Sequence, residues 1–138
     1  MQSDALMEIL NKYWSNHGDL YIHPQIPKEK LSTASLSCKI PQGEKVIGLI
    51  DCTIFGEADD AIVFGNNGVY IHNEFMDNSL LQFPYSDFVK TKFRREDEHI
   101  SVNDFKCIAI GRSIFKLEDL LSILLDIKDL TMSLQQNN

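Results

Sequence analysis

The stretch KVIGLIDCTIFGEADDAIVFGNNGVYIHN, residues 45–73, decides the fold class of this chain. It contains three apolar runs of strand length. A loop of glycine and acidic residues, 56–60, separates the first two runs, and Gly65-Asn66-Asn67-Gly68 separates the second from the third. Asn-Asn between strands favours a type I′ hairpin turn, which needs positive φ at both central residues, a conformation that Asn tolerates. The stretch therefore predicts an antiparallel meander with positive φ at Asn66 and Asn67.

Four further strands are expected after the meander, because short apolar runs continue to alternate with turn residues. The seven predicted strands span residues 46–54, 61–65, 68–73, 79–83, 88–95, 98–102 and 105–110. A helix is expected over about 114–134, where an apolar stripe recurs at helical spacing. The stripe consists of Leu117, Leu120, Leu121, Leu124 and Ile127. We expect Leu117, Leu121, Leu124 and Ile127 to be buried against the sheet.

The N-terminal part of the chain predicts helices. Residues 4–16 carry a broad apolar face at helical spacing. Residues 20–27 contain two prolines and are expected to be extended, and Pro27 can open a short second helix. We therefore interpret residues 1–44 as an N-terminal helical extension and residues 45–138 as a sheet domain with a C-terminal helix. The two form one compact unit of the α+β class.

Four groups of residues add to this pattern: Ile26-Pro27 with Lys28, Lys30, Leu31 and Ala34; Leu49-Ile50-Asp51-x-Thr53-x-Phe55-Gly56; Asn67-Gly68-Val69-Tyr70-Ile71 with Asn73; and Pro84-Tyr85-Ser86-Asp87-Phe88. Together with the order of about seven short strands and one amphipathic helix, they resemble small bacterial pleckstrin-homology-like (PH-like) proteins of unknown function. The resemblance covers about residues 22–127. It implies a strongly bent antiparallel sheet capped at one open end by the C-terminal helix, and a role in recognition.

Proteins of that set often carry Ser-x-Lys-(Asp/Glu)-Gly after Phe-Gly. Here residues 57–61 are Glu-Ala-Asp-Asp-Ala, so the loop has lost a basic residue and gained acids. Glu57, Asp59 and Asp60, with Asp51 nearby, are oxygen ligands of the kind that divalent cations prefer. The loop lacks the D-x-D-x-D-G spacing of a calcium loop, so a polar connection is favoured over a metal site.

Composition narrows the classes of function. The chain has 138 residues, 13 basic and 20 acidic, for a net charge of −7, which argues against nucleic-acid binding. No apolar run reaches the roughly 20 residues of a membrane span, and the N-terminus does not resemble a signal peptide. The three cysteines show no CxxC and the four histidines no zinc-ligand spacing. We expect reduced, buried thiols in a cytoplasmic protein without a cofactor or metal.

One basic cluster is a candidate ligand site. Lys90, Lys92 and Arg94 alternate with Val89, Thr91 and Phe93 along a predicted strand, and Arg95 follows directly. This face predicts either a site for an anionic small ligand or phospholipid headgroup, or a solvated strand face on which lysines prevent edge-to-edge pairing. The solvated face is the favoured alternative.

Two further candidates are a catalytic pair and a partner surface. Cys52 with Asp51 and His72 could form a small cysteine hydrolase, although no sequence signature links the thiol to the imidazole. Trp14, Leu125 and Leu130 widen the apolar faces of the two end helices; they predict packing of these helices on each other, or contact with a protein partner or a second copy. We predict a non-enzymatic protein-binding or scaffolding module, with the anionic-ligand binder as first alternative and the hydrolase as second.

Overall fold

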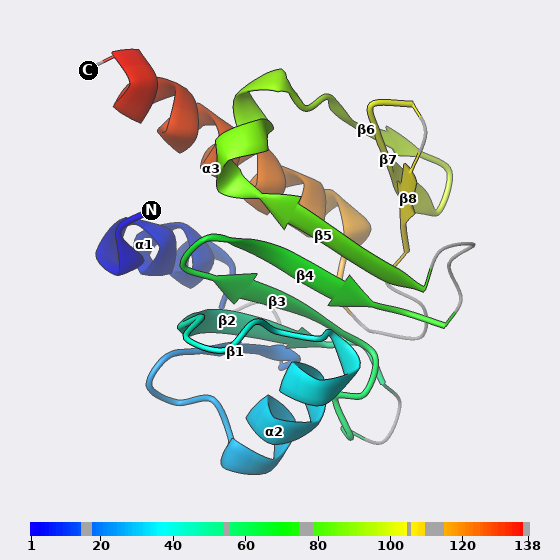
Figure 1. Cartoon of the computed structure of the whole chain (residues 1–138). Coiled ribbons are helices and arrows are strands. Elements are labelled where there is room, and N and C mark those ends of the chain that lie inside the picture. Colours follow the sequence, from blue (N-terminus) through cyan, green and yellow to red (C-terminus); the bar gives the residue numbers. More distant parts are fainter. Residues whose placement is uncertain (15–17, 54–55, 75–78, 105, 110–114, 137–138) are drawn as a thin grey trace.

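The computed structural model describes the chain except for residues 15–17, 54–55, 75–78, 105, 110–114 and 137–138 and the side chains of residues 106, 107 and 136. Within the described residues, three α-helices accompany eight antiparallel strands (Figure 1). The α+β class is therefore confirmed. The helices are α1 (Ser3–Trp14), α2 (Lys28–Ser37) and α3 (Leu117–Gln136).

The strands form two sheets rather than one continuous bent sheet. The first sheet holds five strands in the order β1-β2-β3-β4-β5, and the second holds three in the order β6-β7-β8. All seven predicted strands have a counterpart, and β1 is an additional strand from the segment expected to be extended. The strands are β1 (Leu20–Ile22), β2 (Val46–Asp51), β3 (Ala61–Gly65), β4 (Gly68–His72), β5 (Leu80–Pro84), β6 (Phe93–Glu96), β7 (His99–Val102) and β8 (Lys106–Ile108).

The predicted strand at 88–95 is wrong in its first half. The 3₁₀-helix η1 (Tyr85–Lys90) occupies this part of the chain and separates the two sheets. Residues three apart share a face in a 3₁₀-helix. Tyr85 and Phe88 are accordingly both buried, and their rings meet edge to face with their centroids 5.4 Å apart. The alternation of exposed Lys92 and buried Phe93 survives, because the chain is extended again from Thr91 onward.

The central strands β2, β3 and β4 are buried on both faces, whereas Gln82 and Pro84 of β5 are exposed. Helix α1 packs on one face, and α2 on the other places Ala34 and Cys38 against Leu49 and Val63 (Figure 1). This explains why the central strands read as continuous apolar runs rather than as alternating ones. Gly48 permits the close approach of α1, since a Cβ there would lie 2.4 Å from Leu10 Cδ1.

The prediction of positive φ at Asn66 and Asn67 is wrong: neither is among the positive-φ residues of the described chain. The turn is tight, but the segment that enters β2 holds it. Asn66 N donates to Lys45 O at 2.9 Å, and both carboxylate oxygens of Glu44 accept hydrogen bonds from Asn67. Positive φ at two consecutive residues occurs instead after β7, at Asn103 and Asp104, with values of 53° and 64°.

Helix α3 packs on η1, β6, β7 and α1. Leu120, Ile123, Leu124 and Ile127 are buried, whereas Leu117 and Leu121, which were expected to be buried, are partly exposed at the edge of the core. Packing of the end helices on each other is confirmed, because Lys12 Nζ and Tyr13 Oη both reach Asp126 of α3, at 3.5 and 3.2 Å.

Candidate functional site

Two of the sequence motifs, one with Lys30 and one with Asp51, Thr53 and Gly56, meet in a structural cluster. Lys30 on α2 places its Nζ 2.6 Å from Asp51 Oδ2 at the end of β2, and the same ammonium donates to the carbonyl oxygen of Gly56. The ammonium also lies 5.3 Å from the ring centroid of Tyr21. We call Lys30, Asp51, Thr53 and Gly56 the Lys30 corner. It ties α2 to the sheet and to the loop that follows β2.

Thr53 completes this corner. Its backbone N and its Oγ1 both donate to Asp51 Oδ1, at 2.9 and 2.6 Å, and Oγ1 accepts from the backbone N of Glu57 and Ala58. Burial alone would raise the pKa of Asp51, but hydrogen bonds from Lys30 and Thr53 outweigh it and hold that pKa below its usual value. The acidic loop is thus ordered by hydrogen bonds, and within the described residues no group of three His, Cys, Asp or Glu side chains could hold a metal ion.

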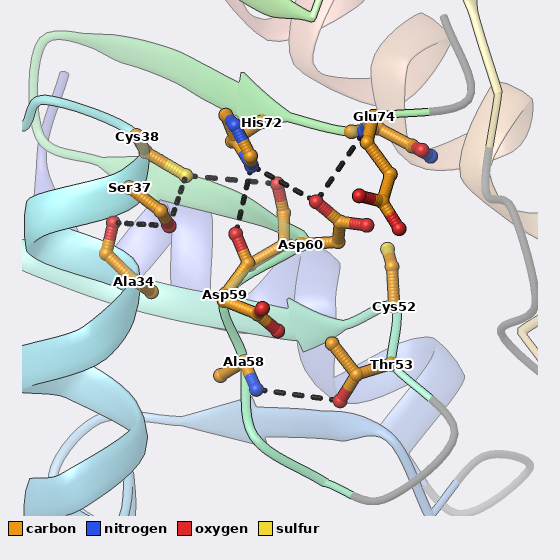
Figure 2. Close-up of polar contacts among 12 residues, drawn as sticks. Ala34, Ser37, Cys38, Cys52, Thr53, Ala58, Asp59, Asp60, His72 and Glu74 are labelled. Carbon is orange, nitrogen blue, oxygen red and sulfur yellow. Dashed lines mark hydrogen bonds and ion pairs between the residues drawn. The ribbon is translucent and has the colours of Figure 1, made fainter.

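The geometry gives no support to the Cys52–His72 pair. Figure 2 shows Asp60 between the two side chains: His72 Nδ1 lies 2.9 Å from Asp60 Oδ1 and 2.8 Å from Asp59 O. The thiol of Cys52 donates instead to Ile50 O, and burial raises its pKa well above 9.0. Because the thiolate is the nucleophile in cysteine catalysis, this environment disfavours activation.

Cys38, the second described thiol in Figure 2, is also buried among backbone groups. Burial raises its pKa to about 11. Cys38 and Cys52 are therefore free and buried, as expected, and the side chain of Cys107 lies outside the described part of the chain.

The basic cluster divides into two parts. Arg94 forms an ion pair with Glu96 and a second one with Asp104, at 3.1 Å, and Arg95 lies 3.8 Å from Glu118 on α3. The two arginines are therefore compensated by acids. Lys90 and Lys92 are exposed, and the recorded ion pairs of the described chain include neither of them.

Lys90 lines a pocket of about 340 Å³ that the sequence did not reveal. The pocket lies between the β5–η1 segment and the end of β7, and Asp87 and Asn103 contribute polar groups to it. Asn103 was missed because its neighbours in the pocket come from another part of the chain. The sequence gives one local indication of this turn: Asn103-Asp104 directly follows an apolar strand, and such a pair tolerates positive φ.

The candidate partner residues do not form one surface. Leu130 lines the groove between α3 and α1 and packs against the core, where it is near Ile9. Trp14, 51% exposed, is on α1, whereas Leu125, 38% exposed, is on the solvent side of α3 with Met132. Among these residues, only Leu125 belongs to an exposed apolar stripe.

No family model matches the chain, and no curated protein and no solved structure matches it either. None of the helices in the described part of the chain combines the length and apolarity needed to cross a bilayer.

Proposed function

We propose that this chain is a non-enzymatic protein-binding module of PH-like architecture, which binds an amphipathic helix of a partner protein on the exposed side of α3. The order of four antiparallel strands, β2 to β5, three more, β6 to β8, and then α3 supports the PH-like assignment. Likeness of fold alone is a weak argument for function, so the proposal depends on the surface of α3.

The observation that carries the proposal is an apolar stripe on the solvent side of α3. Leu121, Leu125 and Met132 recur at i, i+4 and i+11, which places them on one face of the helix. Leu125 and Met132 are each 38% exposed. Lys128, at i+7, sends its ammonium to Thr91 O at 2.8 Å, so its charge is turned toward the body of the protein. We call Leu121, Leu125 and Met132 the α3 stripe.

Charge indicates what kind of helix fits the α3 stripe. Exposed Asp129 lies beside the stripe on α3, Glu118 is also exposed and lies 3.8 Å from Arg95, and the whole chain carries −7. A partner helix with apolar residues at i, i+4 and i+7, flanked by lysine or arginine, would therefore meet complementary shape and charge. A helix flanked by acids would be repelled.

The test uses two synthetic helical peptides with the same apolar stripe, one flanked by lysines and one by glutamates. Fluorescence anisotropy should show that the lysine-flanked peptide binds the native protein, and that Leu125→Glu weakens binding about tenfold or more. Leu36→Glu is the matched control, because Leu36 on α2 is 82% exposed and away from α3.

This pair of variants separates docking from general attraction. Leu125→Glu makes the protein more acidic, so attraction to a basic peptide without docking would be unchanged or stronger in both variants. That outcome would contradict the proposal, as would equal binding of the two peptides. Light scattering on the native chain decides whether a second copy already covers the stripe. If the native chain is a dimer and Leu125→Glu makes it monomeric, the surface of α3 binds a second copy of the chain and not a different protein.

A further inference from the structure

We propose that the pocket beside Lys90 binds a small apolar monocarboxylate with an adjacent N–H group, the chemistry of an N-acylated amino acid or of a peptide C-terminus. This site is distinct from the α3 stripe and does not depend on it. The pocket's volume, about 340 Å³, is in the range of small-molecule sites, and its lining combines an apolar floor with a few polar groups.

The floor comes from Phe83, Pro84 and Val102, contributed by β5 and β7. Phe83 and Val102 are nearly fully buried in the core, so exposed Pro84 presents most of this apolar surface to the pocket. An aliphatic side chain of the ligand would cover this surface and gain free energy by leaving water.

The rim supplies charge of both signs. Lys90 and Asp87 both line the pocket, and no ion pair between them is recorded in the described chain. The Lys90 ammonium can therefore receive a carboxylate, and the Asp87 carboxylate can accept the ligand's N–H.

Asn103 adds a donor at a fixed place. Its Oδ1 accepts a hydrogen bond from Lys92 N at 2.7 Å, and its own backbone N donates to Lys92 O at 2.9 Å. These contacts orient the amide so that its NH₂ group remains available as a donor to a carboxylate. The residue holds φ at 53° between the paired strands β7 and β8, a conformation that Asn tolerates.

The balance of charge selects a monoanion over a phosphate or a lipid headgroup. Lys90 and Asp87 are the charged residues in the pocket lining, and the Lys128 ammonium lies 2.8 Å from the carbonyl oxygen of Thr91, another lining residue. The chain as a whole is acidic. At physiological ionic strength charges beyond about 8 Å are largely screened, so a ligand in the pocket experiences mainly these few groups. Because a carboxylate stands among these ammonium groups, a single negative charge fits the pocket better than two. A ligand carboxylate can pair with the Lys90 ammonium while a neighbouring N–H donates to the Asp87 carboxylate.

The test is titration with N-acetyl-leucine, followed by NMR. Saturable shifts at the backbone amides of Phe83, Val102 and Asn103 are expected, and N-acetyl-leucinamide, which lacks the carboxylate, should bind about tenfold or more weakly. Lys90→Ala should weaken N-acetyl-leucine binding by a similar factor. Lys28→Ala, at an exposed lysine on α2, should leave it unchanged.

Titration with a short peptide distinguishes a peptide C-terminus from a free N-acylated amino acid as the ligand. Tighter binding of acetyl-Ala-Ala-Leu than of N-acetyl-leucine would identify a peptide C-terminus, and equal binding a free amino-acid derivative; either result supports the site. No saturable binding of either carboxylate, equal binding of the acid and its amide, or saturation of the same amides by inorganic phosphate at lower concentration would overturn the proposal.

Discussion

The Lys30 corner and the Lys90 pocket place the same two residue types, a lysine and an aspartate, in opposite circumstances. At the corner, the side chain of Lys30 is 17% exposed and lies 2.6 Å from Asp51, which in turn is bonded to Thr53. At the pocket, Lys90 and Asp87 are exposed, and within the described residues they form no ion pair with each other. Buried charges require partners, so the first pair serves the fold, whereas the second is available to a ligand.

The largest expected effect is at Asp51. Asp51→Ala removes a buried carboxylate and leaves the Lys30 ammonium, whose side chain is 17% exposed, with the Gly56 carbonyl but no carboxylate; breaking such an ion pair typically costs about 3–5 kcal/mol of unfolding free energy. Asp87→Ala is the matched control and should change stability by no more than about 0.5 kcal/mol, as expected for an exposed position. Urea unfolding of the two variants measures both values, and equal losses would remove the distinction between the two sites.

A pH titration sharpens the same comparison. The pKa of Asp51 is held below its usual 3.8, so its contribution is complete above that value and is lost as pH falls through the lowered pKa. For Lys30, burial lowers the pKa, but the hydrogen bond and attraction to Asp51 outweigh this and raise it above 10.5. The contribution of Lys30 is therefore complete below 10.5 and is lost as pH rises through the raised pKa.

Between about pH 5 and about pH 2 the native protein should therefore lose more stability than Asp51→Asn, which has no carboxylate to protonate at this position. Chemical denaturation at a series of pH values measures this difference. Parallel pH curves for the two proteins would show that the pair does not stabilise the fold.

The smallest effect is expected at Asn103, in the Lys90 pocket. Asn103→Gly retains the positive φ but removes the acceptor for Lys92 N, so it should cost about 1 kcal/mol. Asn103→Val should cost more, because a β-branched residue resists positive φ. Thermal unfolding of both variants checks the order, and a Val variant as stable as the Gly variant would contradict the assigned turn.

The sequence predicted the elements better than it predicted the partners of their side chains. The seven strands and the C-terminal helix follow from apolar runs and helical spacing, which are local properties. The turn at Asn66 and Asn67 was misread because Glu44, from the segment before β2, holds it by two hydrogen bonds. The Asn-Asn pair alone does not indicate these hydrogen bonds to a distant carboxylate.

The same limit applies to the candidate sites. Lys92 and Arg94 occupy equivalent positions in the sequence pattern. Arg94 nevertheless forms an ion pair with Asp104, whereas Lys92 forms none within the described residues. Lys30 and Asp51 carried the resemblance as separate motifs, and only the packing of α2 on the sheet shows that they are one interaction. Charge compensation depends on which segments meet in space, so it could not be read from the pattern.

We infer that Lys30 serves the fold, whereas Lys90 is free to bind a ligand. The most direct measurement is the unfolding free energy of Lys30→Met and Lys90→Met, which remove the same charge and keep a side chain of similar length. Lys30→Met should lose about 3–5 kcal/mol, because it leaves Asp51 buried and unpaired with a cation. Lys90→Met should stay within about 0.5 kcal/mol of the native protein. Similar losses in the two variants, or a larger loss at Lys90, would contradict the claim.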